Sequence, residues 1–290
     1  MTFVTRFAPS PTGRLHLGHA YSALLAHDMS RREGGLLLLR VEDIDTTRCR
    51  PEYEAAILED LAWLGLTWPT PVRRQSEHFT DYASALEKLR NIGVLYRCFL
   101  TRREIAEEAM SAPHAPGEGG DGIIYRGPSK PMSEDEQEFR MARGDAFAWR
   151  LSMRYSQDLL GEVFARLEFR ERDEATKAER SIAARPEVHG DIVLARKDTP
   201  ASYHLCVVHD DALQGVTHVI RGEDLRDATH VHVLLQRLLG LPQPIYTHHR
   251  LLTDESGRRF AKRDRSLTLA ALRDAGLAAV DIRARIGLPA

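Results

Sequence analysis

Apolar residues recur at two different spacings along the first hundred residues, and together these spacings predict alternating strands and helices. Short apolar runs at residues 3–8 and 36–41 indicate buried strands, the second stopped on its N-terminal side by Gly34–Gly35. Between them, residues 18–33 carry apolar side chains three to four positions apart, which indicates an amphipathic helix. A strand, a helix and a strand in this order form a βαβ unit, which implies a parallel sheet.

The same two spacings continue downstream and extend this pattern. Helical spacing is expected over 52–66, 77–92, 224–239 and, near the end, 266–287. Strands are expected at 192–195, 203–208, 216–220 and from 245 onward.

The middle of the chain differs in character from the segments on either side. Residues 111–131 are rich in glycine and proline and predict a loop with one short extended piece. We therefore expect an α/β fold with a Rossmann-like, doubly wound parallel sheet, interrupted by an insertion whose internal structure stays open. The predicted parts are 1–96 (first half of the Rossmann domain), 97–188 (connective insertion), 189–247 (second half) and 248–290 (a basic loop followed by C-terminal helices).

Composition narrows the class of protein without naming it. The chain has 290 residues, 43% of them hydrophobic and 28% charged, with a net charge of −2. No stretch approaches the ~20 apolar residues that span a bilayer, and the N-terminus lacks the pattern of a secretory signal. Three scattered cysteines favour a reducing cytoplasm over a disulfide framework. The net charge argues against a nonspecific nucleic-acid coat but allows a local basic face.

The stretch RFAPSPTGRLHLGH, residues 6–19, lies where the first strand passes into the first helix. Free amide groups and the helix dipole make such a junction suitable for a phosphate. His16 and His19 bracket the turn, and Gly18 lets a ligand approach the backbone. A surface turn with two exposed histidines is the simpler interpretation of this stretch alone, and a zinc pair would lack a third ligand nearby.

A second basic segment changes the balance between these interpretations. Residues 258–265, RRFAKRDR, hold five basic residues and one acid. Such a charge run is usually a solvated surface, but together with the opening stretch it is typical of a mobile lysine loop over ATP phosphates.

These two sequence motifs resemble the signatures of class I aminoacyl-tRNA synthetases. HLGH resembles their HIGH signature, and FAKRD resembles a degenerate KMSKS signature with Lys262 in the place of its second lysine. RFAPSPTGRLHLGH, RVEDIDTTR (40–48) and GVTHVIRGEDL (215–225) closely resemble glutamyl-tRNA synthetases in particular. The resemblance covers residues 5–96 and 190–265 well and the insertion poorly.

A glutamate site needs an acid for the ammonium group and an arginine for the side-chain carboxylate, because the guanidinium fork binds a carboxylate through two hydrogen bonds. By resemblance, Glu42 takes the ammonium group, and Tyr203 and Arg221 complete the pocket, with Arg221 on the side-chain carboxylate. The resemblance also places one stretch beside the amino acid: Arg6, Phe7, Ala8, Pro9 and Ser10.

Each of these three assignments has a structural alternative. Glu42 could cap a turn, Tyr203 could be a core aromatic residue, and Arg221 could pair with Glu223 or Asp224.

The implied chemistry is attack of the glutamate α-carboxylate on the α-phosphate of ATP. The resemblance assigns ATP binding to His16, Gly18, His19 and Lys262, of which the two histidines and the lysine are the catalytic residues. Mg²⁺ is expected to accompany ATP.

The acceptor of the activated glutamate depends on the C-terminal segment. Only about 25 residues follow the basic loop, too few for an anticodon-binding domain. This resembles the truncated glutamyl-Q tRNA(Asp) synthetase family, which implies transfer of L-glutamate to the queuosine base in the anticodon stem-loop of tRNA(Asp). Residues 246–290 hold nine Arg or Lys against five acids, as an RNA partner would favour. We expect a cytoplasmic monomer without a membrane partner.

One departure from the family concerns zinc. Members often carry a C-x-C pair followed later by Y-x-x-x-C, whereas this chain has Cys98-Phe99-Leu100 and Tyr125 followed by Ser129. Only Cys98 and Tyr125 remain of four ligands, so no structural zinc is expected. Nor do we expect a metal at the histidine-rich stretches 229–233 and 248–249, since His230 and His232 point different ways on a helix.

Three other functions stay open at this point. The chain could charge the 3′ end of an ordinary tRNA, it could be an adenylyltransferase with an H-x-G-H loop, or it could be a non-catalytic, synthetase-like RNA-binding module.

Overall fold

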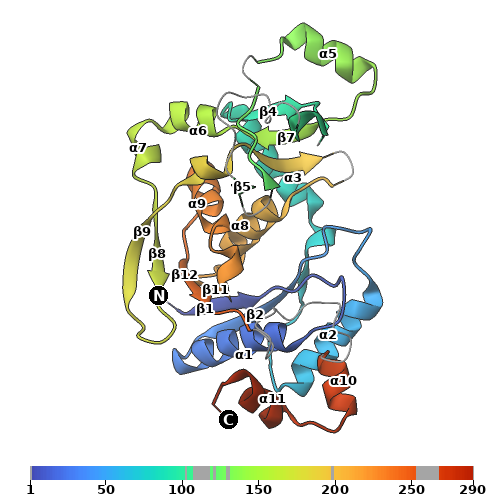
Figure 1. Cartoon of the computed structure of the whole chain (residues 1–290), viewed down its shortest axis with the longest axis vertical. Helices are drawn as coiled ribbons and strands as arrows, with labels where there is room; N and C mark the ends of the chain where they lie inside the picture. Colours follow the sequence, from blue (N-terminus) through green and yellow to red (C-terminus); the bar gives the residue numbers. More distant parts are fainter. Residues whose placement is uncertain are drawn as a thin grey trace.

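The main sheet is built from two groups of strands that lie side by side (Figure 1). The computed structural model describes residues 2–101, 103–106, 118–119, 122–128, 131–196, 199–252 and 268–289. The first group is ordered β1-β2-β3, and its members are β1 (Val4–Phe7), β2 (Leu36–Val41) and β3 (Arg73–Arg74). The second is ordered β11-β12-β8-β9, and its members are β11 (His218–Gly222), β12 (Ile245–His249), β8 (Glu168–Arg172) and β9 (Glu179–Ala183). All of these strands except the last, β9, run parallel to their neighbours.

Hydrogen bonds at Thr217, the residue before β11, join the two groups. Its amide donates to the carbonyl of Val4 at 2.9 Å, and its hydroxyl accepts from the amide of Val4 at 2.9 Å. The order of strands therefore reverses between β1 and β11, and ligands of open α/β sheets bind at such a reversal.

Helices cover both faces of this sheet, and each face has its own apolar core. One core holds α1 (Leu17–Arg32), α2 (Pro51–Trp63), α10 (Leu269–Asp274) and α11 (Ala279–Ile286). The other holds α3 (Phe79–Asn91), α8 (Tyr203–Leu213) and α9 (Ala228–Leu239). No helix of the described ranges is long and apolar enough to cross a membrane.

The strands and helices expected in the two predicted halves of the Rossmann domain, residues 1–96 and 189–247, are present with one exception. The strand expected at 203–208 is wrong, because these residues begin α8, whose N-cap Ser202 accepts from the amide of Leu205. Four consecutive residues of this helix, from Leu205 to Val208, are at most 2% exposed. A short run of consecutive apolar residues has no polar face, so its pattern cannot be distinguished from that of a buried strand.

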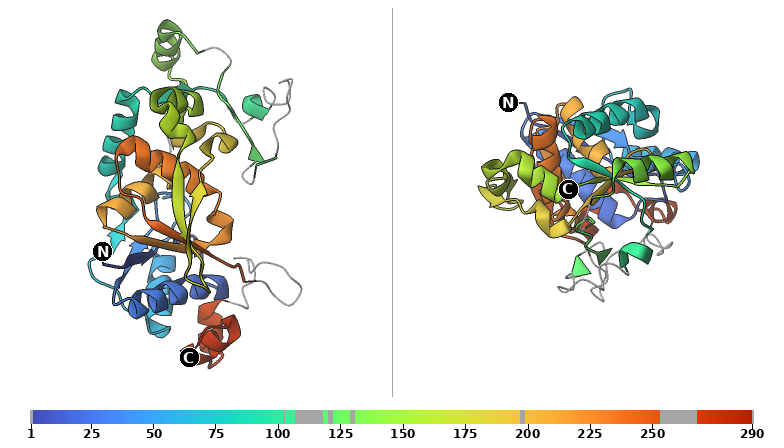
Figure 2. Two further views of the ribbon diagram at one scale, coloured as in Figure 1. Left: turned by 90° about the vertical axis from the view of Figure 1, so that its left-hand side faces the viewer. Right: turned by 90° about the horizontal axis from the view of Figure 1, so that it is seen from above.

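Residues of the predicted insertion, together with 95–96 and 192–196 on either side of it, form a second layer at one end of the elongated molecule (Figures 1 and 2). The strand expected at 192–195 therefore lies outside the parallel sheet. An antiparallel sheet joins β4 (Leu95–Cys98), β7 (Ala148–Leu151) and β10 (Ile192–Arg196). Around it lie α5 (Glu134–Ala142), α6 (Met153–Leu160), α7 (Glu162–Ala165) and the small pair β5 (Glu118–Gly119) and β6 (Gly122–Ile123). The β8–β9 hairpin, also inside the predicted insertion, instead lies on the main sheet beside β12.

Candidate active site

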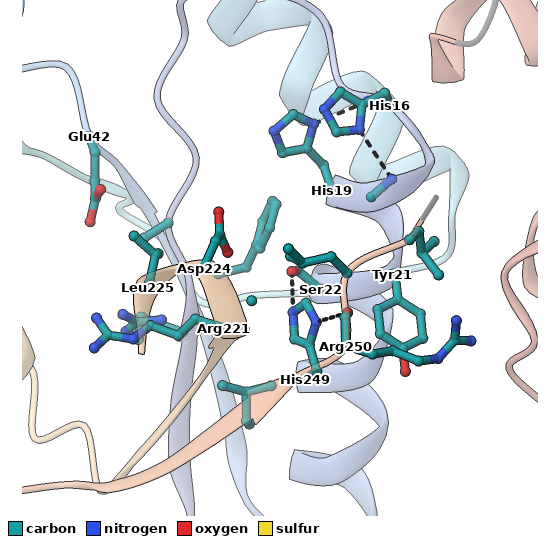
Figure 3. Close-up of a pocket in the computed structure, with 18 of the residues that line it drawn as sticks. His16, His19, Tyr21, Ser22, Glu42, Arg221, Asp224, Leu225, His249 and Arg250 are labelled. Carbon is teal, nitrogen blue, oxygen red and sulfur yellow. Dashed lines mark hydrogen bonds between the residues drawn. The ribbon is translucent and has the colours of Figure 1, made fainter. Parts of the chain in front are cut away.

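A cavity of about 380 Å³ opens at the carboxyl ends of β1 and β11, beside the start of α1. Nine of the twelve predicted site residues line it: Arg6, Phe7, Ala8, His16, Gly18, His19, Glu42, Tyr203 and Arg221. Figure 3 shows Glu42 and Arg221 on one side and His16 and His19 on the other. The cavity therefore has one end with a carboxylate and a guanidinium group and another end with two imidazole rings.

Two of the remaining three predicted residues, Pro9 and Ser10, do not line the cavity. The carbonyl of Pro9 accepts from the amide of Glu42 at 3.1 Å, so Pro9 supports the acid from behind. Ser10 is exposed, and its carbonyl accepts from the amide of Thr12. Lys262 lies outside the described residues, and its role stays a prediction.

The two histidines form the N-terminal cap of α1. The amide of Gly18 donates to Nδ1 of His16 at 3.1 Å, and the amide of His16 donates to Nδ1 of His19 at 3.2 Å. Because both Nδ1 atoms accept, the proton of each neutral ring lies on Nε2, which is therefore a donor. A Cβ on residue 18 would lie 3.0 Å from Cε1 of His16, so the glycine leaves room for the ring.

The Glu42 end of the cavity rests on a buried network of charges. Arg40, which is 0% exposed, contacts Glu42 at 3.3 Å and Asp211 at 2.8 Å. Asp211 also accepts from Nε of Arg6 at 3.1 Å. Burial raises the pKa of Glu42, while Arg40 and Arg6 act in the opposite direction. A substrate ammonium group would offset the same desolvation by supplying a further positive charge.

The alternative of a turn cap belongs to the neighbouring acid. Asp43 accepts from the amide of Ser76 at 2.8 Å and from its hydroxyl at 2.6 Å. Glu42 instead lines the cavity. Of the two adjacent carboxylates, Asp43 therefore stabilises the turn and Glu42 faces the cavity.

Arg221 is 5% exposed, yet it forms no ion pair with any acid of the described ranges, Glu223 and Asp224 included. Its guanidinium instead contacts four uncharged acceptors: Tyr203 Oη (3.4 Å), His232 Nδ1 (3.2 Å), Thr229 Oγ1 (2.7 Å) and His248 Nε2 (3.5 Å). It also lies over the ring of Tyr246, 5.3 Å from the centroid. A buried cation without a counter-ion is costly, so this arrangement favours an anionic ligand.

The histidines around Arg221 are neutral at physiological pH. Burial, followed by the charge of Arg221, lowers the pKa of His248 to about 4 and that of His232 well below its ordinary value. Neutral imidazoles can accept from the guanidinium, whereas imidazolium ions would repel it. His230, on the same helix as His232, accepts from the amide of Arg185 instead. The two rings therefore point different ways, as the helical spacing predicted.

Sequence reasoning missed the opposite wall of the cavity and the charges beneath it. His249 lines the wall, receiving the hydroxyl of Ser22 at Nε2 (2.5 Å) and donating from Nδ1 to the carbonyl of Arg250 (2.8 Å). Arg250 lies 5.0 Å from the ring of Tyr21. The acid pair Asp210 and Asp211 was missed because the expected strand at 203–208 would not carry them below the site.

Cys98 and Tyr125 are the two residues that remain of the family's zinc ligands. They lie in one small apolar cluster with Ile105. Within the ranges that the structure describes, no three His, Cys, Asp or Glu side chains are grouped so as to hold a metal. The prediction about zinc stays a prediction.

Comparison with known proteins gives the same type of fold. Residues 2–287 match the catalytic domain of the class I tRNA synthetases (E and Q). The chain is 49% identical over 290 residues to a protein of Rhodobacter capsulatus named Glutamyl-Q tRNA(Asp) synthetase, covering 98% of this chain and 100% of that one. It is 35% identical to the Glutamate--tRNA ligase of Aquifex aeolicus, covering 94% of this chain and 54% of the ligase.

Among solved structures, a glutamate tRNA ligase from Elizabethkingia meningosepticum in complex with its amino acid superimposes with a TM-score of 0.70. It shares 28% sequence identity, and the match covers 91% of this chain and 52% of that one.

Proposed function

The chain belongs to the class I tRNA synthetases for glutamate and glutamine, and from this premise we propose that it activates L-glutamate with ATP and transfers it to queuosine in tRNA(Asp). It is a ligase of the aminoacyl-tRNA synthetase type, with an activity like that of glutamate–tRNA ligases. This membership removes the adenylyltransferase alternative. The observation that carries the choice of glutamate is the buried Arg221, which lacks an acidic partner among the described residues.

The proposed roles follow from the two ends of the cavity. Arg221, with Tyr203 beside it, binds the side-chain carboxylate of glutamate, and Glu42 binds its ammonium group. The Nε2–H groups of His16 and His19 donate to phosphate oxygens as charge develops on them. The α-carboxylate then attacks the α-phosphate, forming glutamyl-adenylate and releasing pyrophosphate. Catalysis of this kind consists of positioning and charge stabilisation, with little covalent work for the protein.

Mg²⁺ would enter with ATP and neutralise charge on its phosphates. Among the described residues no ready-made cluster of protein ligands exists, and this fits an ion held mainly by phosphates and water.

Lys262 is proposed to contact the phosphates in the transition state. Lys262→Ala is therefore expected to lower kcat of ATP–pyrophosphate exchange while KM for glutamate stays nearly constant, because only a transition-state contact is lost. Steady-state exchange at varied glutamate measures both constants. An equal change in KM for glutamate would contradict the assignment.

The queuosine acceptor is supported by the name of the relative that this chain matches over almost its whole length. We expect radiolabelled glutamate to be transferred to tRNA from queuosine-containing cells, on tRNA(Asp), and not to tRNA from cells unable to make queuosine. Equal labelling of both pools would instead indicate charging of a tRNA 3′ end. No labelling of either pool, together with no glutamate-dependent exchange, would indicate a non-catalytic RNA-binding module.

A further inference from the structure

Glu171 is a buried acid on β8 that lies behind Arg221 without touching it. It is 5% exposed and comes from the hairpin that leaves the insertion and pairs with β12. Its Oε1 lies 2.8 Å from Nδ1 of His248, while Oε2 accepts from Arg180 and Arg226 at 2.7 Å each. Burial alone would raise the pKa of Glu171, but His248 and the two arginines hold it below its ordinary value, so the carboxylate is ionised.

The contact with this carboxylate determines which nitrogen of His248 carries the proton. A carboxylate accepts only, so Nδ1 of His248 is the donor, and in the neutral ring Nε2 is left as an acceptor. The hydroxyl of Thr229 lies 3.0 Å from Nε2 and must therefore donate to it. That leaves the lone pairs of the hydroxyl for the NH2 nitrogen of Arg221, at 2.7 Å. One series of hydrogen bonds thus runs from Glu171 through His248 and Thr229 to Arg221, and the donor of each bond is defined.

We infer that Glu171 is a positioning residue for glutamate recognition, acting through His248 and Thr229 to hold the guanidinium of Arg221 in the plane that meets the substrate carboxylate. This inference rests on the proposed function, since it takes Arg221 as the ligand of that carboxylate. The bidentate geometry of an arginine and a carboxylate requires such an orientation. Outer hydrogen-bond partners that orient a binding group are a general means of tuning it.

A purely structural role for Glu171 makes a different prediction. If the acid only anchored the hairpin through Arg180 and Arg226, its loss would disturb the sheet and affect both substrates equally. Through the residues that the structure describes, its hydrogen bonds lead into the cavity by way of His248 and Thr229 to Arg221, while His16 and His19 lie at the other side (Figure 3). Glutamate recognition should therefore change selectively.

The test compares Glu171→Gln with the control Arg180→Gln in ATP–pyrophosphate exchange. An amide has one acceptor, for which Arg180, Arg226 and His248 would compete, so the NH2 group of the glutamine faces either the arginines or the ring. The second orientation forces the other tautomer on His248 and removes the acceptor for Thr229. Arg180 touches Glu171 with a side chain that is 65% exposed, and its loss leaves the contact with His248 in place.

For Glu171→Gln we expect KM for glutamate to rise roughly tenfold or more, KM for ATP to stay within about twofold, and discrimination against glutamine to fall. Arg180→Gln should behave as the wild type. Thr229→Val, which keeps the shape and removes both hydrogen bonds, should reproduce the selective loss and serves if Glu171→Gln fails to fold.

An unchanged KM for glutamate in a folded Glu171→Gln or Thr229→Val protein, or an equal rise of both KM values, would overturn the inference. Wild-type protein without glutamate-dependent exchange would instead overturn the proposed function, so the two failures are distinguishable.

Discussion

Arg221→Ala is expected to raise KM for glutamate by roughly 30-fold or more while KM for ATP changes little. Removing one partner of a buried, hydrogen-bonded charge pair costs about 2–5 kcal/mol, and each 1.4 kcal/mol is about tenfold in affinity. The substrate carboxylate would be that partner, because Arg221 has no ion pair within the ranges that the structure describes. ATP–pyrophosphate exchange at varied glutamate and at varied ATP measures the two constants.

Two variants sharpen this test. Arg221→Lys keeps the positive charge but loses the planar fork, so we expect an intermediate loss and poorer discrimination against glutamine. Arg237→Ala, on the exposed side of α9, is the matched control and should behave as the wild type. If Arg221→Ala left KM for glutamate unchanged, Arg221 would not be the ligand of the side-chain carboxylate.

Arg40→Met is expected to lower the free energy of unfolding by about 3–5 kcal/mol, the usual cost of leaving buried charges without their partner. The arginine is 0% exposed and lies within 4 Å of three acids, Glu42, Asp210 and Asp211. Methionine fills a similar volume, so the decrease in the free energy of unfolding comes from acids that lack a cationic partner and not from a cavity. Urea unfolding followed by circular dichroism, with the slope compared between variants, measures the change.

The control for this second prediction is Arg48→Met. Arg48 pairs with Asp45, but its side chain is 75% exposed, and surface pairs contribute about 1 kcal/mol or less. A loss for Arg40→Met as small as that for Arg48→Met would show that the buried acids do not depend on Arg40.

The features that the sequence predicted well are those built from neighbours in the chain. The β1–α1–β2 unit follows from the change between consecutive and helical apolar spacing. The histidine cap joins residues at most three positions apart, so the spacing of His16, Gly18 and His19 is enough to assign them to one turn. Arg221 was found through the family motif at residues 215–225, and its lack of an acidic partner among the described residues became visible only in the folded protein.

The two misassigned or unassigned regions have a common physical cause. The start of α8 was predicted as a strand because both of its faces are buried, and a fully apolar run carries no periodicity. The β8–β9 hairpin is rich in charged residues, and its sequence does not indicate that it pairs with β12. In both cases the partner surface, and not the local pattern, decides the outcome.

The sequence by itself therefore determined most strands and helices of the two halves, the turn that carries His16 and His19, and the family to which the chain belongs, because each depends on residues close together in the chain. Only the tertiary structure decided which charges meet. Arg6 contacts Asp211 from 205 positions away, and Glu171 contacts His248 from 77 positions away. Such pairs depend on how distant elements pack, since burial makes an ion pair or a fixed tautomer necessary only where the folded chain excludes water.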